Sequence, residues 1–332
     1  MIGRKGVVLV GIPETGEILG AVSAPDFKPD LFTGRISAND WEAVINDPNK
    51  PLVNRYNTGL YPPGSIMKMI TELALLQNSE FDPNKPYTCS GSYQFGDRVF
   101  GCWKIDGHGE VYLTNAISQS CDIYFYKTIN NYDLDILSEL FSSFGFGHPV
   151  GIDIEGELKG LIPTTDYMNN RYGKSGWSKG SLLNFCIGQG EILVTPMQVF
   201  NYTNILATKG NSFRPHFVKL NTLINNKPID VEPKHWNRII SDMGQVVMSP
   251  SGTGKSANPS IENLKVFGKT GTAENPHGND HAWFIGWMEK YNKKYSVVVL
   301  HENGGSGGSI AAPIAKNIFL ELNNLMVLRD QL

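Results

Sequence analysis

The chain has 332 residues, 41% of them hydrophobic and 18% charged, a balance that can bury a core and excludes global disorder. Its net charge of −3 includes no Lys/Arg block, which argues against a nucleic-acid surface. No segment approaches the roughly 18 consecutive apolar residues of a membrane helix, and residues 1–17 lack a signal-peptide layout. The sequence therefore predicts a soluble domain whose partner is a small or peptide-like substrate.

In chain order, the pattern predicts a β-hairpin, a loop-rich passage to about residue 62, a helical block, three strands and a closing helix. The predicted strands cover residues 6–13, 17–24, 265–272, 281–290 and 294–301, and the predicted helices cover 65–77, 111–120, 124–132, 133–145, 195–208 and 309–326. Strands at both ends that enclose helices predict one five-stranded antiparallel sheet covered by helices, an α/β fold of the α+β type. We expect residues 1–332 to form a single domain, with a helical subdomain over about 65–260 inserted between the two strand regions.

Ser65 and Lys68 place a hydroxyl and an amine three residues apart at the start of a predicted helix. That spacing puts both side chains on one helical face, one turn from each other. A serine is a weak nucleophile until a base takes its proton, and a neutral lysine amine can be that base. The pair alone is weak evidence, because a serine that caps a helix followed by a solvated lysine is the commoner explanation.

Two further elements strengthen the catalytic interpretation. Residues 120–122 (S-C-D) supply a second hydroxyl and a carboxylate, and Lys269, Thr270, Gly271 and Thr272 end an apolar strand. Gly271 permits close approach to the backbone, while the two threonine hydroxyls and the lysine charge can hold a carboxylate. S-x-x-K, then S-D-N, then K-T-G is the motif set of penicillin-binding proteins and class A β-lactamases. The same order here makes coincidence improbable.

The sequence resembles the transpeptidase domain of class B penicillin-binding proteins, most closely the elongation-specific branch known as penicillin-binding protein two. The landmarks of the resemblance are TGEILGAVSAPDF, PLVNRYNTGLYPPGSIMK, GHGEVYLTNAISQSCDIYFY, GIDIEGE, IGQGEILVTPMQ, FGKTGTAE and HAWFIGW. Asp122 stands where most members of the wider family have Asn, and the elongation branch tolerates Asp there. The resemblance implies the penicillin-binding protein and serine β-lactamase fold. It also implies a periplasmic domain whose native protein has an N-terminal inner-membrane anchor and a pedestal domain that this chain lacks.

The resemblance further implies a peptidoglycan D,D-transpeptidase that crosslinks stem peptides, acts in cell elongation and rod shape, and is inhibited by β-lactams. The implied roles are nucleophile for Ser65, base for Lys68, proton relay for Ser120, electrostatic tuning for Lys269, and carboxylate binding for Thr270, Gly271 and Thr272. The backbone N–H groups of Ser65 and Thr272 would form the oxyanion hole. Asp122 would orient its neighbours by hydrogen bonding; the alternative is a carboxylate that only complements a helix dipole.

Three cysteines and a histidine have spacing that suits a metal. Cys89, Cys102, His108 and Cys121 follow the pattern C-x12-C-x5-H-x12-C, and a Cys3His set is a closed ligand sphere for structural zinc. The surrounding segment is polar and Gly-rich, so a zinc ion would order it. Elongation-branch members bind zinc here with Asp in place of some cysteines. Two alternatives are a Cys89–Cys102 disulfide, which a periplasmic location would permit, and a Cys121 that is simply buried. No catalytic metal is predicted.

Other functions remain open at this stage. A β-lactamase would share the motifs, but residues 151–160 lack the Leu-Asn ending found near the deacylating Glu of class A enzymes. A D,D-carboxypeptidase would differ only in its use of water, and a β-lactam sensor would acylate once without turnover. By resemblance, the expected partners are stem peptides and β-lactams. For the native protein they include a membrane glycosyltransferase of the shape, elongation, division and sporulation family, and the rod-shape elongation complex.

Several other residues receive structural interpretations. Cys186 has no companion cysteine nearby and is expected to be buried. His281 alternates with Trp283 along a predicted strand, which favours packing in the sheet over catalysis. Residues 188–190 (G-Q-G) lack the spacing of a phosphate loop and are expected to shape a turn beside the active site.

Overall fold

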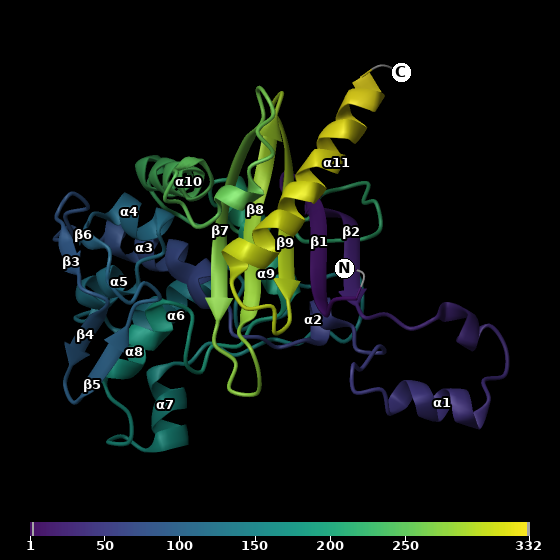
Figure 1. Ribbon diagram of the computed structural model, residues 1–332, viewed down its shortest axis with the longest axis horizontal. Coiled ribbons are helices and arrows are strands. Elements are labelled where there is room, and N and C mark those ends of the chain that lie inside the picture. The colour runs from purple at the N-terminus through teal and green to yellow at the C-terminus, as the bar shows by residue number, and fades with distance from the viewer. Residues whose placement is uncertain (2, 331–332) are drawn as a thin grey trace.

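The computed structural model describes residues 1 and 3–330, and its centre is a five-stranded sheet (Figure 1). The strand order is β2-β1-β9-β8-β7, and each neighbouring pair is antiparallel. These strands are β1 (Gly6–Ile12), β2 (Glu17–Ala24), β7 (Lys265–Ala273), β8 (His281–Lys290) and β9 (Lys293–His301). Because β1 pairs with β9, the two ends of the chain close one sheet, which confirms the predicted fold class.

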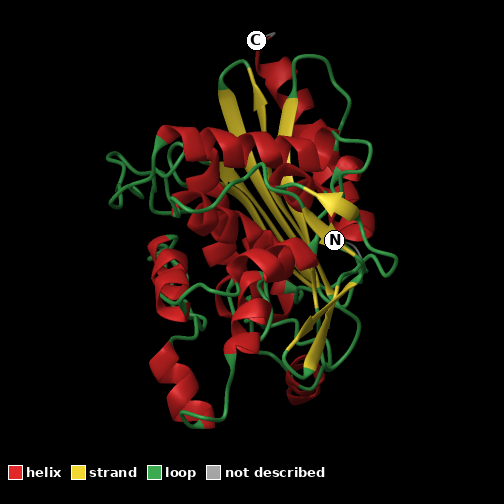
Figure 2. Cartoon of the chain, turned by 90° about the vertical axis from the view of Figure 1, so that its left-hand side faces the viewer, coloured by secondary structure: helices red, strands yellow, loops and turns green. Residues whose placement is uncertain are grey.

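Helices cover both faces of this sheet (Figure 2). The side chains of β9 alternate, so that Val298 and Leu300 join one apolar cluster and Val297 and Val299 join the other. α9 (Pro196–Ala207) lies on the first side and α11 (Ala312–Asp330) on the second. No helix among the described residues is long and apolar enough to cross a membrane. The result is a three-layer arrangement in which the central strands are buried on both faces.

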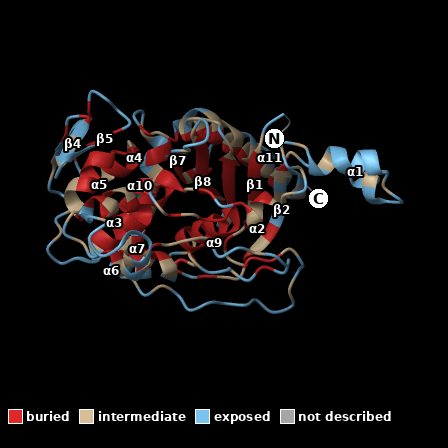
Figure 3. Ribbon diagram, turned by 90° about the horizontal axis from the view of Figure 1, so that it is seen from below, coloured by how far each residue is buried: buried red, intermediate tan, exposed pale blue. Residues whose placement is uncertain are grey.

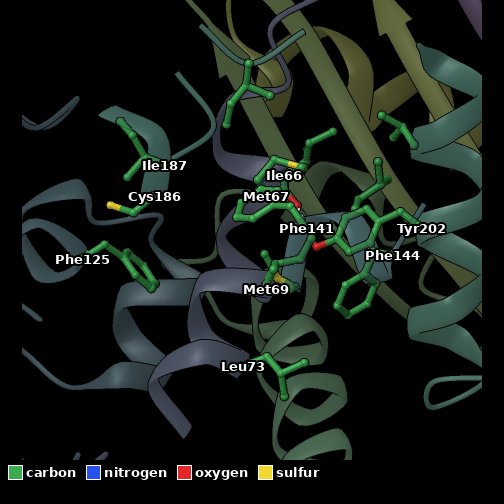
Figure 4. Packing of buried hydrophobic residues seen from close by; sticks show 14 of the residues in the cluster. Ile66, Met67, Met69, Leu73, Phe125, Phe141, Phe144, Cys186, Ile187 and Tyr202 are labelled. Carbon is green, nitrogen blue, oxygen red and sulfur yellow. Dashed lines mark hydrogen bonds between the residues drawn. The ribbon is translucent and has the colours of Figure 1, made fainter. Parts of the chain in front are cut away.

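A helical block lies beside the β7 edge of the sheet (Figure 1). It contains α3 (Lys68–Gln77), α4 (Leu113–Ser118), α5 (Asp122–Ile129), α6 (Leu134–Ser143), α7 (Thr165–Tyr172), α8 (Lys179–Cys186) and α10 (Pro233–Met248). α3 is buried from Lys68 to Leu75, and Figure 4 shows Met69 among the apolar side chains of neighbouring elements. This burial makes α3 a rigid support for the residues at its start.

The segment before α3 contains more structure than the sequence predicted. α1 (Ala38–Ile45) and the short α2 (Arg55–Thr58) lie in the passage expected to be loop, and α1 has no buried residue (Figure 3). Ser65 lies within a 3₁₀ turn, Gly64–Met67, so the α-helix predicted over 65–77 begins three residues later, at Lys68. Gly64 has φ of 61°, a left-handed conformation that glycine adopts without strain and that prevents a regular helix start.

Two small sheets form part of the helical block. β3 (Tyr87–Cys89) pairs with β6 (Gly109–Val111), and β4 (Ser92–Phe95) pairs with β5 (Arg98–Gly101). Residues 89–109, which include β4 and β5, have few buried apolar side chains, and Phe100 is one of them. Their order therefore depends on turns, short strands and the cysteine cluster described below.

Glu72 is a carboxyl group buried completely within α3. In the described part of the chain, no donor group gives a hydrogen bond to either Glu72 oxygen. The neighbouring polar group is another acid, the carboxyl group of Asp242 on α10. Asp242 in turn accepts hydrogen bonds from Thr114 and Arg238, each at 2.8 Å. Burial first, and then the charge of Asp242, raise the pKa of Glu72 well above its ordinary value. Glu72 and Asp242 thus form a buried acid pair in which protonation of Glu72 relieves the repulsion between the carboxylates.

This acid pair should make stability depend on pH. The contribution of protonated Glu72 is fully present below its unfolded pKa of 4.5 and is lost as pH rises through its higher folded pKa. The melting temperature of the wild type should therefore fall more steeply between pH 5 and 9 than that of Glu72→Gln, which keeps a neutral hydrogen-bond donor. Thermal unfolding at several pH values measures this, with the exposed Glu80→Gln as control. Parallel curves for wild type and Glu72→Gln would contradict the assignment.

Candidate active site

Ser65 lies where the helical block meets the sheet. It is partly exposed, while the adjoining Gly64 and Ile66 are buried. The N–H of Gly64 donates to the carbonyl of Gly188 at 2.8 Å, and a Cβ at position 64 would lie 2.8 Å from the carbonyl oxygen of Thr272. Only glycine therefore lets the turn approach β7 so closely. The predicted turn at residues 188–190 does lie beside this site, as its contact with Gly64 shows.

Lys68 is fully buried one helical turn after Ser65. Its Nζ donates to the carbonyl and the Oγ of Ser120, at 3.0 and 3.1 Å, and to Asp122 Oδ1 at 2.7 Å. The Asp122 side chain is only 11% exposed, so this ion pair is largely shielded from water. The structure thus brings the first two sequence motifs into direct contact.

Ser120 accepts a hydrogen bond from a second lysine. Lys269, also fully buried, donates from Nζ to Ser120 Oγ at 2.8 Å and to the carbonyl of Thr270 at 2.9 Å. Burial first, and then the positive charge of Lys68, lower the pKa of Lys269, while Asp122 opposes that shift. Because Ser120 Oγ accepts from both lysines, its own proton remains available for a third partner. Ser120 also has φ of 54°, a left-handed conformation uncommon for serine and typical of functional sites.

The end of β7 forms the remaining wall of the site. Thr272 is exposed, and its Oγ1 accepts a hydrogen bond from the N–H of Gly307 at 3.3 Å. The buried Thr270 donates to Thr253 Oγ1 at 2.7 Å. A Cβ at Gly271 would lie 2.9 Å from the side chain of Ile66, so glycine is required for β7 to contact the Ser65 turn. Thr253 was missed by the sequence argument, because it lies in a loop after α10 with no recognisable spacing.

The predicted residues thus converge into one constellation. A partly exposed serine hydroxyl lies one turn from a buried lysine, and a second hydroxyl lies between two buried lysines. Such a site can activate a serine nucleophile, move protons through Ser120, and attract an anionic substrate group. These are the requirements of acyl transfer through a serine ester.

The cysteine cluster lies directly behind this constellation. The ligand atoms of Cys89, Cys102, His108 and Cys121 all lie within 4.8 Å of one another, and the four cysteines of the chain are free thiols. His108 Nδ1 is 3.5 Å from the sulfur of Cys89 and 3.6 Å from that of Cys102. Tetrahedral zinc with ordinary bond lengths holds its ligands about 3.5 to 3.8 Å apart, so the two His108–sulfur distances and the Cys3His chemistry fit that ion.

The segment around this cluster contacts both sides of Ser120. The N–H of Trp103, which follows Cys102, donates to Asp122 Oδ2 at 3.3 Å, and the Trp103 indole donates to the carbonyl of Gln119 at 2.9 Å. Cys121 itself separates Ser120 from Asp122. The cluster is therefore placed to hold the Ser120 loop against the two lysines.

Cys186, His281 and Trp283, which the sequence analysis assigned to packing, are all buried. Cys186 is fully buried, with its thiol donating to the carbonyl of Leu183. Trp283 is fully buried in β8, and its indole donates to the carbonyl of Pro62, while His281 is 9% exposed.

Comparisons with known proteins point to one family. The model of the penicillin-binding protein transpeptidase domain family matches residues 6–320. Peptidoglycan D,D-transpeptidase MrdA of Haemophilus influenzae is 35% identical over 343 residues, covering 95% of this chain and 52% of that protein. MrdA of Escherichia coli K12 is 31% identical over 355 residues, covering 98% and 56%. This chain thus spans about half the length of the curated relatives that it matches.

Solved structures give the same result. PBP2 of Pseudomonas aeruginosa in complex with WCK 5153 has a TM-score of 0.88 and 34% identity, covering 96% of this chain and 73% of that chain. PBP2 of Helicobacter pylori in complex with MreC also has a TM-score of 0.88, with 31% identity, covering 97% of this chain and 61% of that chain. These similarities confirm the resemblance to the penicillin-binding protein two branch, and the chain belongs to the penicillin-binding protein transpeptidase family.

Proposed function

We propose that this chain is the catalytic domain of a peptidoglycan D,D-transpeptidase that works through a serine acyl-enzyme. The observation that carries the proposal is the convergence of Lys68 and Lys269 on Ser120 Oγ, beside the accessible Ser65. This arrangement supplies a nucleophile, a base and a proton donor within one site, which acyl transfer from an amide requires.

In the acylation step, Lys68 acts as a neutral amine, and it takes the hydroxyl proton of Ser65 while Ser65 Oγ attacks the carbonyl carbon of the penultimate D-Ala. The backbone N–H groups of Ser65 and Thr272 stabilise the oxyanion that forms. When the C–N bond breaks, Ser120 gives its proton to the leaving nitrogen of the terminal D-Ala. The proton held by Lys68 can then replace it, because Lys68 Nζ lies 3.1 Å from Ser120 Oγ.

The substrate carboxylate binds at the end of β7. Thr272 donates to it, Thr270 donates once its hydroxyl turns away from Thr253, and Lys269 contributes positive charge, so a C-terminal D-Ala is favoured over an amide. After that D-Ala departs, the amine of a neighbouring stem peptide attacks the ester, and its excess proton passes to the Lys68–Ser120 pair and from there to Ser65 Oγ as the ester C–O bond breaks. The products are the crosslinked peptide and free Ser65. β-Lactams would acylate the same serine, and the resulting ester would be cleaved only slowly.

The proposal is tested with a D-Ala-D-Ala donor peptide and a second stem peptide that carries a free amine. Mass spectrometry should find a product equal to donor plus acceptor minus one D-Ala, absent with Ser65→Ala. Donor that has only lost D-Ala would indicate a carboxypeptidase, and a stable adduct without either product would indicate a sensor. Rapid turnover of benzylpenicillin instead would indicate a β-lactamase.

We also propose that Cys89, Cys102, His108 and Cys121 hold a structural zinc ion. The two distances from His108 to cysteine sulfurs match a tetrahedral sphere and all four ligand atoms lie within 4.8 Å of one another, which supports this, as does the scarcity of buried apolar side chains in the segment. Four protein ligands would leave no open position, so the ion would supply no catalytic chemistry. Its effect would be to order the segment that contacts Asp122 and Gln119.

We further propose that the native protein acts in cell elongation, anchored in the inner membrane with this domain in the periplasm. The similarity to the PBP2 of the Helicobacter pylori complex with MreC supports a partnership with the rod-shape machinery. The similarity to a chain of a peptidoglycan synthase complex, at 30% identity, supports a partnership with a membrane glycosyltransferase.

A further inference from the structure

One carboxylate outside the catalytic constellation joins two side chains from distant parts of the sequence. Glu302 Oε1 accepts a hydrogen bond from Arg55 Nε at 2.8 Å and another from the Tyr61 hydroxyl at 2.6 Å. The side chains of Arg55 and Glu302 are 5% and 16% exposed, and Tyr61 is buried. Charge-assisted hydrogen bonds shielded from water are the short and strong kind, so this junction holds a defined geometry.

Tyr61 begins the short segment that ends at the nucleophile. Its backbone exchanges hydrogen bonds with Val194, at 3.0 and 2.9 Å. Two prolines follow at 62 and 63, and Gly64 adjoins Ser65. Since each proline fixes its own φ, the segment has fewer backbone rotations that can absorb a displacement at Tyr61. The position of the Tyr61 side chain therefore bears on the position of Ser65.

Glu302 belongs to the sheet and not to that segment. It directly follows β9, and its N–H donates to the carbonyl of Lys5 at 2.9 Å. The next residue, Asn303, donates its N–H to Nδ1 of His281 at the start of β8, and the His281 ring packs edge-on against Tyr61. Because β8 pairs with β7, the anchor of Glu302 is continuous with the strand that carries Lys269 and Thr272.

From this geometry we propose that Glu302 is a positioning residue for the nucleophile. Held by Arg55, it fixes the Tyr61 hydroxyl and so sets Ser65 and its backbone N–H relative to Thr272, the other half of the oxyanion hole. The inference rests on the proposed function. Its consequence is that the junction affects the chemical step of acylation more than ligand binding, since small displacements of reacting groups cost rate strongly.

Tyr61→Phe is the sharpest variant, because it removes one hydroxyl and leaves the ring, the fold and the Arg55–Glu302 pair in place. Arg55 is less informative, since its guanidinium also donates to the carbonyls of Asn49, Lys50 and Val53. Glu302→Gln tests the charge. Tyr112→Phe is the matched control, because the exposed Tyr112 makes the same type of bond, to Glu110 at 3.0 Å.

The experiment is stopped-flow acylation with benzylpenicillin, which separates the rate constant of the chemical step from the dissociation constant of the first complex, alongside thermal melts. Tyr61→Phe and Glu302→Gln should each slow the chemical step by about tenfold, with the dissociation constant within about twofold of wild type. The double variant should be no slower than the slower single variant, because both remove one interaction. Tyr112→Phe should match wild type.

Two results would overturn the proposal. The first is a chemical step within about twofold of wild type in both Tyr61→Phe and Glu302→Gln, and the second is multiplicative losses in the double variant. A wild-type chain that forms no adduct at all would overturn the proposed function and this inference together. Normal acylation of wild type with unaffected variants would overturn only the positioning role.

Discussion

Replacing Lys68 with methionine is expected to slow acylation of Ser65 by benzylpenicillin by about a thousandfold, the usual range for losing a positioned base. Lys68 is fully buried, and its Nζ lies 3.1 Å from Ser120 Oγ and 2.7 Å from Asp122 Oδ1. Without its amine, the site loses the base that we propose takes the Ser65 proton. The second-order acylation rate constant, followed by intact-mass spectrometry, measures the effect.

Loss of a buried cation could also disturb the fold, so two further variants separate the causes. Lys68→Arg keeps the positive charge beside Asp122 but cannot accept a proton, and it should be nearly as slow as the methionine variant. Lys290→Met removes another buried lysine, one that donates to Asn323 at 2.7 Å far from Ser65, and it should acylate at the wild-type rate. Acylation by Lys68→Met within tenfold of wild type would mean that another group is the base.

Removing the proposed zinc ion is expected to cause the largest loss of stability. The chain should purify with about one zinc ion, and Cys121→Ser should lower both the zinc content and the free energy of unfolding, the latter by at least about 3 kcal/mol. For a chain of this size that loss corresponds to about 5 °C in melting temperature. Elemental analysis and thermal melts measure the two effects, and a strong chelator should reproduce the loss in the wild type.

Cys186→Ser is the matched control for this experiment. Cys186 is as buried as Cys121 but lies outside the cluster, and its thiol donates to a carbonyl that a serine hydroxyl can also reach. It should keep the full zinc content. A wild type that lacks zinc and carries a disulfide between Cys89 and Cys102, detected by non-reducing peptide mapping, would contradict the zinc site and favour the alternative pairing.

The elements with strong periodicity could be predicted, and those defined by tertiary contacts could not. The strands β1, β2, β7, β8 and β9 were evident because their apolar runs are bounded by turn residues. The helix at 195–208 was evident from its helical pattern and from Pro196, which suits a first turn; the structure adds a capping box between Thr195 and Gln198. By contrast, α1 is short and has no buried residue, so the helical spacing of Trp41, Val44 and Ile45 reflects no core packing. The 3₁₀ turn at Ser65 depends on Gly64 contacting Gly188 and Thr272, which sequence spacing does not reveal.

The same distinction applies to the site. Ser65, Lys68, Ser120 and Lys269 belong to motifs with fixed local spacing, and the structure brings them together. Thr253 and Glu302 reach the site through contacts with residues 17 and 241 positions away in the chain, and neither lies in a motif. Their importance became visible only when the sheet placed the loop after α10 and the end of β9 beside β7 and Tyr61.

An intact-mass time course with benzylpenicillin, followed by peptide mapping of the adduct, tests the central claim most directly. A single adduct located on Ser65, persisting for many minutes and absent from Ser65→Ala, is the predicted result. An adduct on another residue, or an unchanged adduct in Ser65→Ala, would contradict the assignment of Ser65 as the acylated nucleophile.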